Sequence, residues 1–378
     1  MKIILVITGL GVGGAERQVI DLADEFFKGG HEVTLVCLTG PVILRPESPS
    51  IRLVVLGMSK SPLRFFRAAI AFKKVIESFR PDIVHSHLVH ANLFTRVLRM
   101  WMKMPVLISS AHNTSEGAWW RYMAYRVTDR LADISTNVSA EGVSVFERKG
   151  AVGKNRMILV YNGISTTKFR FDSEARQRVR ASLGLNVDQK FLLAVGSLSS
   201  QKDYPNLLEA VAKLQLSMPN FIVAIAGGGP LALELKQLVI ELGLYEDRVL
   251  FLGIRKDVVD LMSAADVFVL SSAWEGFGLV VAEAMAMQRL VVATDCGGVR
   301  EVLADCGFLV EPKDSDKLAE MLKSVMQIDT QVAAQIGLAA RRRIETDFAV
   351  DAAARGWLAI YGKYREKAQL ISERKTNV

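Results

Sequence analysis

Cysteine is scarce in this chain, with 3 Cys among 378 residues. Cys37 lies far from the other two, and the ten positions between Cys296 and Cys306 fit no zinc motif. Three thiols also cannot all pair with one another. We therefore expect reduced thiols in a cytosolic compartment, and neither a disulfide framework nor a structural zinc ion.

Long apolar runs are missing as well. No uninterrupted apolar stretch approaches the ~20 residues that a membrane span needs, so we expect no crossing of a bilayer. The opening MKIILVITGLGVGGAERQ has an apolar run of only about five residues, shorter than the ~7 to 15 of a signal peptide. We interpret this opening as a first buried strand.

Acidic residues are few in the first half of the chain. Residues 1–170 contain 23 Lys and Arg but 13 Asp and Glu, a net charge of +10, whereas the remainder has a net charge of −3. The excess is densest from Lys60 to Lys103, where aromatic and methionine residues are interleaved with the basic ones. An anionic membrane surface suits such a segment. Nucleic acid is the competing partner, but because no nucleic-acid motif is recognised we expect none to bind.

Apolar runs typical of strands alternate with helical patterns throughout. KIILVIT, a glycine loop, AERQVIDLADEFFKGG and HEVTLVCLTG form a βαβ pattern, which indicates a parallel sheet covered on both faces. A second alternating series starts at FLLAVGSL. A chain of this length usually exceeds one hydrophobic core. We predict an α/β protein with two doubly wound, Rossmann-like domains, 1–170 and 171–354, and a C-terminal helix at about 355–378 that packs back on the first domain.

The stretch SSAWEGFGLVVAEAM, residues 271–285, sets Glu275 and Glu283 on either side of a glycine-containing turn and a helix start. A helix start offers unpaired amides and the positive end of the helix dipole to a phosphate. A carboxylate accepts hydrogen bonds from sugar hydroxyls. The stretch therefore indicates a nucleotide-sugar site. The alternative is an ordinary strand, turn and helix with a capping Glu275 and a solvated Glu283.

Two further segments indicate phosphate binding, each weakly. AVGSLSSQKDYPNLLEA puts Lys202 between a strand end and a helix start, where an ammonium group suits a diphosphate. A solvated loop lysine explains the segment equally well. GLGVGGAERQ is similar to a phosphate loop, but it lacks the GxGxxG dinucleotide pattern and the GxxxxGK[ST] pattern. Nicotinamide and ATP sites are therefore disfavoured.

Taken in order, a set of motifs along nearly the whole chain resembles the retaining family 4 glycosyltransferases. These enzymes have the GT-B architecture, in which two Rossmann-like domains face each other across a cleft. The motifs are GGAER, PDIVHSH, AHNT, VYNG, VGSLSSQKDYPNLLEA, AGGGPL, LGIRKDV, the E-x7-E segment and CGGVREV…GFLVEP.

The resemblance implies a role for each matching position. Glu283 would bind the nucleotide ribose, Glu275 with the amides that follow it would hold the donor sugar and phosphates, and Lys202 would bind the diphosphate. His112 would contact the donor sugar near the reacting carbon, and Arg255 lies in the loop that passes the base. Catalysis is thus implied for His112, Glu275 and Lys202, and donor or nucleotide binding for Gly13, Gly14, Gly196, Ser197, Lys202, Arg255, Phe277, Gly278, Leu279, Val280 and Glu283.

Three positions depart from the family pattern. Ser197 stands where an arginine is usual, Ser165 where an aspartate is usual, and Asp203 where a glycine commonly follows the lysine. The first departure matters most because it removes a cation from the diphosphate. Stabilisation of the leaving group would then rely more on Lys202, on amides at the helix start, or on another basic residue such as Arg17.

The implied reaction needs no metal ion and no cofactor. Lys202 and the oriented amides would stabilise the charge of the leaving nucleoside diphosphate. Retention is expected by attack on the same face, with a donor phosphate oxygen taking the acceptor proton. We do not expect His85 and His87 to be metal ligands, because no partners follow them at suitable spacing. A plain polar residue at a strand end is the alternative for His112.

We therefore predict a retaining glycosyltransferase that moves a hexose or N-acetylhexosamine from a nucleotide-diphosphate sugar, with UDP favoured over GDP. The predicted acceptor is a saccharide linked to polyprenyl diphosphate, in O-antigen, capsule or exopolysaccharide synthesis. The predicted location is cytoplasmic, peripherally bound to the inner face of the cell membrane. A nucleotide-sugar epimerase or hydrolase of the same fold, or a catalytically silent nucleotide-sugar-binding subunit, are the alternatives. Base, sugar, acceptor and linkage position stay open.

Overall fold

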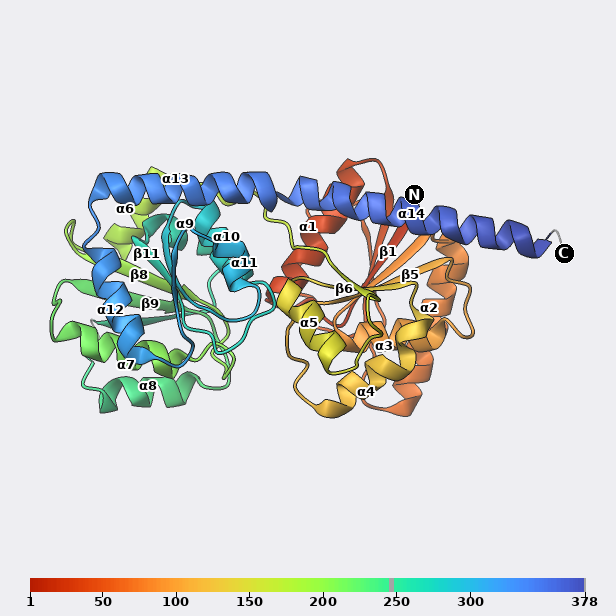
Figure 1. Ribbon diagram of the computed structural model, residues 1–378, viewed down its shortest axis with the longest axis horizontal. Helices are drawn as coiled ribbons and strands as arrows, with labels where there is room; N and C mark the ends of the chain where they lie inside the picture. The colour runs from red at the N-terminus through yellow and green to blue at the C-terminus, as the bar shows by residue number, and fades with distance from the viewer. Residues whose placement is uncertain (245–247, 377–378) are drawn as a thin grey trace. The chain divides into compact units, whose positions relative to one another are not determined.

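The computed structural model describes residues 1–244 and 248–376 and forms two compact units (Figure 1). The first unit comprises Met1–Gly163 together with Val350–Val378, and the second comprises Ile164–Ala349. The divisions thus fall at 163/164 and 349/350, where the sequence placed them at 170/171 and 354/355. The chain leaves the first unit once and returns to it once.

Within the described residues, the first unit is built on a seven-stranded parallel sheet in the order β3-β2-β1-β4-β5-β6-β7. Its strands are β1 Lys2–Ile7, β2 Glu32–Cys37, β3 Arg52–Val55, β4 Ile83–His87, β5 Val106–Ala111, β6 Ile134–Asn137 and β7 Met157–Leu159. Its helices are α1 Gly14–Lys28, α2 Pro62–Phe79, α3 Val89–Leu98, α4 Trp119–Thr128, the short 3-10 helix Asp129–Leu131, α5 Ala140–Arg148 and α14 Val350–Thr376.

Strand β1 shows why this sheet is buried on both faces. Its side chains alternate between two clusters: Ile3, Leu5 and Ile7 belong to one, and Ile4 and Val6 belong to the other. Because successive side chains of a strand point to opposite faces, a continuous apolar run fills a core on each side.

The C-terminal helix α14 covers one of these faces. Trp357 and Tyr361 are buried in the same cluster as Ile3 and Leu5, and the ring of Tyr361 lies 5.5 Å from that of Phe26 on α1. Figure 1 shows α14, in blue, passing along the first unit next to α1. The aromatic residues of the tail therefore complete the core of the unit that contains the first strand.

The second unit has, within the described residues, a six-stranded parallel sheet in the order β10-β9-β8-β11-β12-β13. Its strands are β8 Lys190–Val195, β9 Phe221–Ala226, β10 Val249–Gly253, β11 Val267–Leu270, β12 Leu290–Thr294 and β13 Phe308–Val310. Its helices are α6 Ser173–Ser182, α7 Tyr204–Gln215, α8 Ala232–Glu241, α9 Val258–Ala264, α10 Leu279–Ala286, α11 Val299–Leu303, α12 Ser315–Met326 and α13 Thr330–Asp347.

Both sheets reverse their strand order at one point. In the first unit β1 lies between β2 and β4, and in the second unit β8 lies between β9 and β11. Ligands of open α/β sheets bind beyond the carboxyl ends of the strands at such a switch point. The loops after β1, β4, β8 and β11 are therefore the places to look for a site.

The predicted fold class, two doubly wound parallel sheets, is confirmed. The sequence interpretation did not assign two of the four edge strands, β3 and β13. Each is short, and β3 has no buried residue, so neither gives the strong apolar run that marks a central strand. Within the part of the chain that the structure describes, no helix is long and apolar enough to span a membrane.

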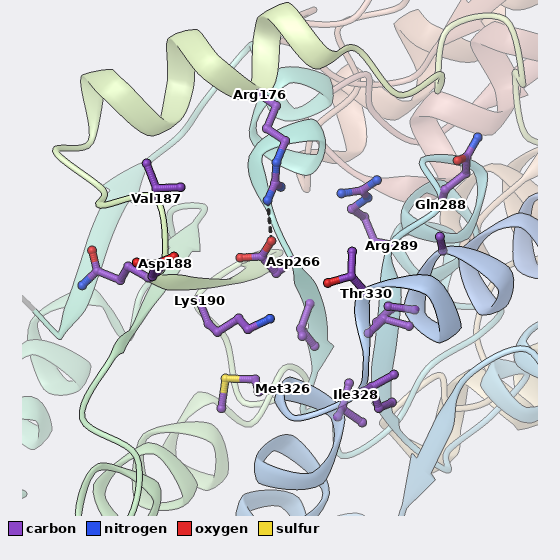
Figure 2. A pocket seen from close by; sticks show the side chains of 16 residues that line it. Arg176, Val187, Asp188, Lys190, Asp266, Gln288, Arg289, Met326, Ile328 and Thr330 are labelled. Carbon is purple, nitrogen blue, oxygen red and sulfur yellow. Dashed lines mark hydrogen bonds and ion pairs between the residues drawn. The ribbon is translucent and has the colours of Figure 1, made fainter.

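Asp266 ties helix α6 to the start of β11 in the second unit. Figure 2 shows its carboxylate beside Arg176 in a hollow at the amino ends of β8, β11 and β12. Arg176 and Arg180 contact the two carboxylate oxygens at 2.5 and 3.2 Å, and the backbone amide of Phe191 donates to Asp266 at 2.8 Å. Burial raises the pKa of Asp266, but these partners outweigh it, so the pKa lies below the ordinary value of 3.8.

Replacing Asp266 by Asn should lower the free energy of unfolding by roughly 2–4 kcal/mol at pH 7, because two partly buried guanidinium groups lose their counter-charge. The pKa of Asp266 is lower in the folded state, so its stabilising effect is present above the unfolded pKa and is lost as pH falls through the folded value. The difference in the free energy of unfolding between wild type and variant should therefore shrink below pH 3.8. Urea unfolding at pH 7 and in the acid range measures it.

Asp316→Asn is the matched control, because Asp316 pairs with Lys213 at 2.6 Å on the exposed surface of the same unit. It should cost less than about 1 kcal/mol at either pH. Equal losses in the two variants would contradict the role assigned to Asp266.

Candidate functional site

Glu275 lies in the turn between β11 and α10 and is only 6% exposed. Its Oε1 lies 2.5 Å from Nζ of Lys202 and accepts a hydrogen bond of 2.7 Å from the Ser272 hydroxyl. Gln201 Nε2 approaches the other carboxylate oxygen at 3.4 Å. The structure therefore brings together two of the three residues for which the sequence predicts catalysis.

Two main-chain contacts hold the loop after β8 against the turn after β11. The Ser271 hydroxyl donates to the Lys202 carbonyl at 2.8 Å, and the Ala273 amide donates to the Gln201 carbonyl at 2.9 Å. Because β8 and β11 are paired strands, their loops leave the sheet side by side. The position of Lys202 relative to Glu275 is thus fixed by backbone as well as by charge.

Gly196 lies beside Lys202 at the end of β8. A Cβ atom at Gly196 would lie 2.9 Å from Cε of Lys202, and one at Gly227 would lie 1.8 Å from the Gly196 carbonyl oxygen. The loops after β8 and β9 therefore approach each other more closely than side chains allow. Ser197, the next residue, is exposed, and its hydroxyl lies 3.0 Å from that of Ser199. Two neutral hydroxyls thus occupy the place where the family usually has an arginine.

Asp203, the other departure next to Lys202, has left-handed backbone geometry with φ +44° and precedes α7. Glycine adopts this conformation without cost, which accounts for its use at this position in the family. Aspartate visits the region more readily than most residues with a side chain. The loop after Lys202 therefore keeps the left-handed backbone conformation that glycine favours, with aspartate in place of glycine.

Helix α10 begins directly after the turn that carries Glu275. Its N-terminal flanking residue is Gly278, with φ +83°, and Phe277 is buried with its ring 5.5 Å from Phe348. Leu279 and Val280 form the first turn, whose amides have no partner within the helix. Glu283 is half-buried one turn further on, above Leu279. The predicted amide donors and the second glutamate thus belong to one short helix.

The loop after β12 supports this turn from outside. The Gly298 amide donates to the Gly276 carbonyl at 3.1 Å, and Gly297 has φ +58°. A Cβ atom at Gly297 would lie 2.0 Å from the Glu275 carbonyl oxygen. Glycine is therefore required at position 297 for two reasons, its backbone conformation and the close approach of the turn.

Arg255 lies apart from this group, in the loop after β10. It is exposed and forms a two-pronged contact with Asp257, at 2.7 and 2.5 Å. Its predicted contact with the base stays a prediction.

Gly13 and Gly14 form the start of α1 in the first unit. Gly13 flanks the helix in an extended conformation, and the carboxylate of Glu16 folds back toward it, so that a Cβ atom at Gly13 would lie 2.4 Å from Oε2 of Glu16. Burial raises the pKa of Glu16. An acidic side chain therefore shares this helix start, next to the amides that the sequence assigns to ligand binding.

His112 follows β5 in the first unit. Its Nε2 lies 3.0 Å from Nδ1 of His87, the last residue of β4. Its other ring nitrogen, Nδ1, is buried and has no hydrogen-bond partner among the described residues. Burial lowers the pKa of His112 to about 4, so the ring is neutral at pH 7.

Sequence reasoning missed that His112 belongs to a group of buried polar atoms without partners. Four of them lie at or just after the ends of β1, β4 and β5, and one lies on α1. Within the described residues, the unpartnered atoms there are Thr8 Oγ1, Gln18 Nε2, His87 Nε2, His112 Nδ1 and Asn113 Oδ1. Buried polar atoms normally have partners, so this group indicates a place for a hydroxyl-rich ligand or water. The sequence signal that could have revealed this group is the position of HSH, residues 85–87, and AHN, residues 111–113, at strand ends.

Glu116, four residues after His112, was missed too. Its side chain is buried, and burial raises its pKa to about 7 against the opposing charge of Arg121. No motif marks this residue.

Across residues 1–244 and 248–376, no three His, Cys, Asp or Glu side chains are grouped closely enough to hold a metal ion. The triplet Asp314-Ser315-Asp316 matches the letters of a DxD motif. Asp314 caps α12 by accepting from the Lys317 amide at 2.9 Å, and Asp316 pairs with Lys213. The triplet is therefore a helix start.

The hollow in Figure 2, about 510 Å³ in volume, contains none of the predicted site residues. Lys190, Asp266 and Leu290 line it at the amino ends of their strands, whereas Lys202 and Glu275 follow the carboxyl ends. The two places therefore lie at opposite edges of the same sheet.

Comparison with known proteins places this arrangement in a family. A profile described as Glycosyl transferases group 1 matches residues 175–343, and one described as Glycosyltransferase Family 4 matches residues 12–168. The chain belongs to the family 4 glycosyltransferases. The resemblance predicted from sequence is thus confirmed, and the protein is a glycosyltransferase.

Relatives of this glycosyltransferase share most of its length. The lipopolysaccharide core biosynthesis mannosyltransferase LpsB of Rhizobium meliloti is 29% identical over 363 residues, which are 91% of this chain and 97% of LpsB. An N-acetylgalactosamine-N,N'-diacetylbacillosaminyl-diphospho-undecaprenol 4-alpha-N-acetylgalactosaminyltransferase of Campylobacter jejuni is 26% identical, covering 87% and 91% of the two chains. Anabaena Alr3699/HepE, crystallised with UDP-glucose, superposes with a TM-score of 0.84 at 23% identity, covering 96% and 100%. This last likeness is one of fold.

Gly297→Ala should destabilise the second unit, because the new Cβ atom meets the Glu275 carbonyl and the backbone resists a side chain at φ +58°. Gly184→Ala is the matched control, since Gly184 has φ +66° but open space around it. Gly297→Ala should lose about 1–3 kcal/mol more than the control, measured by urea unfolding. Similar losses would show that the contact with Glu275 does not constrain the turn.

Proposed function

We propose that this glycosyltransferase transfers a hexose or N-acetylhexosamine from a nucleotide-diphosphate sugar, with retention of configuration and without a metal ion. The observation that supports this most is the buried Lys202–Glu275 pair beside the start of α10. A cation and a helix N-terminus suit a diphosphate, and two carboxylates suit the hydroxyls of the ribose and the sugar. We infer that Glu283 binds the ribose and that Glu275 binds the transferred sugar.

The proposed chemistry breaks the bond between the anomeric carbon and the diphosphate, and the electron pair stays on the phosphate oxygen. Lys202 and the amides of Gly278, Leu279 and Val280 stabilise that charge through fixed dipoles in a site shielded from water. The acceptor oxygen bonds to the anomeric carbon on the same face, and a donor phosphate oxygen takes the acceptor proton. Since Ser197 brings no charge, Lys202 has the larger share in this stabilisation.

We propose a lipid-linked saccharide as the acceptor, on polyprenyl diphosphate, in the synthesis of O-antigen, capsule or exopolysaccharide. The names of the Rhizobium and Campylobacter relatives support this class, since one acts in lipopolysaccharide core biosynthesis and the other on a diphospho-undecaprenol saccharide. UDP is favoured over GDP as the leaving group. The fold neighbour from Anabaena binds UDP-glucose.

We also propose peripheral binding to the anionic inner face of the cell membrane, through α2 and the segment after α3. Leu63, Phe66 and Ile70 project from α2 into solvent next to Arg64 and Arg67, and Phe66 is 63% exposed. After α3, Trp101 is 69% exposed. Apolar side chains beside basic ones bind an anionic bilayer surface.

The aromatic residues of this segment divide between core and surface. Phe72 is buried in the core of the first unit, and Phe65 and Phe79 pack against it, so these three are unavailable to a membrane. Among the four phenylalanines of α2, Phe66 is therefore the one that is exposed.

A nucleotide-sugar hydrolase or epimerase, or a silent binding subunit, would use the same donor residues. A panel of UDP- and GDP-sugars, each with and without a polyprenyl-diphosphate saccharide, separates these functions by release of nucleoside diphosphate and by product mass. Acceptor-dependent release with one added sugar supports the proposal. Release or isomerisation without acceptor would replace it by hydrolase or epimerase. If the wild type turns over no donor in the panel and Ser197→Arg does, a catalytically silent binding subunit is favoured.

Lys202→Ala and Glu275→Ala should each lower kcat by about 100-fold or more, because each removes a charge or hydrogen bond that acts on the leaving group or the sugar. Initial rates with the donor and acceptor found in the panel give the value. Lys236→Ala, an exposed lysine of the same unit, is the control and should leave kcat unchanged. Thermal unfolding of all three variants separates lost chemistry from lost folding, and full activity in either site variant would overturn the assignment.

The double variant Arg64→Glu, Arg67→Glu should float with anionic vesicles much less than wild type, because each basic residue near the surface contributes about 1 kcal/mol to binding. Vesicles of phosphatidylglycerol and phosphatidylcholine, against phosphatidylcholine alone, provide the test. Lys236→Glu, Lys323→Glu changes the net charge equally on the second unit and should float like wild type. No preference of the wild type for anionic lipid would remove the membrane proposal.

A further inference from the structure

His87 and His112 meet at the carboxyl edge of the first sheet. His87 ends β4 and His112 follows β5, two paired strands in which His87 stands opposite Ser110. Nδ1 of His87 lies 3.0 Å from Nε2 of His112, and the ring centroids are 5.2 Å apart. The two imidazoles are thus joined edge to edge by one hydrogen bond.

Both rings of this pair are neutral near pH 7. Burial lowers the pKa of His112 to about 4, and burial together with the neighbouring histidines lowers the pKa of His87 well below its ordinary value. A hydrogen bond between two neutral imidazoles needs one proton between the facing nitrogens. His87 Nδ1 and His112 Nε2 therefore share one proton.

That single proton determines the hydrogen-bonding character of the two remaining nitrogens. If His87 donates, His112 carries its proton on Nδ1, which is then a donor. If His112 donates, its Nδ1 is a bare acceptor and His87 Nε2 carries a proton. Both of these outer nitrogens, His87 Nε2 and His112 Nδ1, are buried and have no partner among the described residues. One donor and one acceptor are therefore always left for a ligand.

We propose that His87 is a positioning residue for His112, and that the pair offers one donor and one acceptor to the hydroxyls of a saccharide. The hydrogen bond with His87 orients the ring of His112, and the direction of that bond sets the tautomer of His112 and so decides whether Nδ1 gives or receives a hydrogen bond. This inference rests on the proposed function, because it names hydroxyls of the sugar substrates as the partners. A hydroxyl is a donor and an acceptor at once, which matches what the pair presents.

His85 packs against the ring of His87, and its own hydrogen bonds go to Tyr361 and Ser110, not to the pair. The rings of His85 and His87 lie with their centroids 3.9 Å apart and are tilted by 38°. His85 itself is anchored at both nitrogens, by the Tyr361 hydroxyl at 2.6 Å and by the Ser110 hydroxyl at 2.7 Å. Because His85 is equally buried in the same row but lies outside the proposed pair, it provides a matched control.

15N NMR of the full chain, labelled at histidine, reports the tautomers of His87 and His112 directly. The protein has 5 His, so substitution of each in turn assigns the signals. In wild type we expect one protonated and one bare nitrogen on His112, in a single tautomer. His87→Leu removes the partner and should give a mixture of tautomers, whereas His87→Asn, whose amide donates or accepts near the position of Nδ1, should keep one. His85→Gln should leave the His112 signals unchanged.

Steady-state kinetics supply the second readout. His87→Leu should lower kcat about 10- to 100-fold, as the loss of an orienting partner does at other histidine sites, with a smaller change in KM for the donor. His87→Asn should recover most of that loss. If His85→Gln, which keeps the pair, lowers kcat as much as His87→Leu, the effect is one of packing and the proposal is wrong.

The two readouts separate failure of this inference from failure of the proposed function. A single tautomer of His112 in His87→Leu overturns the inference, whatever the activity. The wild type could show a single tautomer of His112 that His87→Leu loses, while the protein has no transferase activity. That result would support the positioning role and overturn the proposed function. If His87→Leu does not fold, His87→Asn becomes the test. A single tautomer of His112 with turnover within tenfold of wild type supports the inference. A single tautomer with turnover below one tenth, or mixed tautomers with unchanged turnover, overturns it.

Discussion

Every strand in each sheet runs in the same direction, and the site residues depend on this arrangement. Parallel strands end at one edge, so loops that are far apart in the sequence emerge there as neighbours. Lys202 follows β8 and Glu275 follows β11, and the pairing of these strands brings them within hydrogen-bonding distance. His87 and His112 meet for the same reason at the ends of β4 and β5.

The two units satisfy their buried polar groups in opposite ways. In the second, Lys202 and Glu275 form an ion pair at 2.5 Å. In the first, burial removes the charge from His87 and His112, and a neutral hydrogen bond remains. Burial requires a charge to be paired or lost. A charged pair suits a diphosphate, whereas neutral groups that donate and accept suit sugar hydroxyls.

Much of the fold was predictable from the sequence because the central strands are continuous apolar runs separated by helical patterns. The edge strands β3 and β13 were not, since they lack that pattern. In the candidate site, the motif around Glu275 was recognisable. The unpartnered atoms of Thr8, Gln18 and His87 were not, because a hydrogen-bond partner is a property of three-dimensional surroundings. Residues 314–316 show that letters alone can also mislead: they match a DxD motif, but Asp314 is a helix cap.

The class of this protein follows from its consecutive residues: two parallel-sheet units, the glycosyltransferase motifs, and the order in which they occur. Hydrophobic periodicity and turn residues act locally, so these features are written in consecutive residues. Which polar groups share a proton or a counter-charge depends on the folded chain. The bond between His87 and His112, and the contact of Glu275 with both Lys202 and Ser272, depend on strand pairing and burial. Those are properties of the packed chain, and no short stretch of residues contains them.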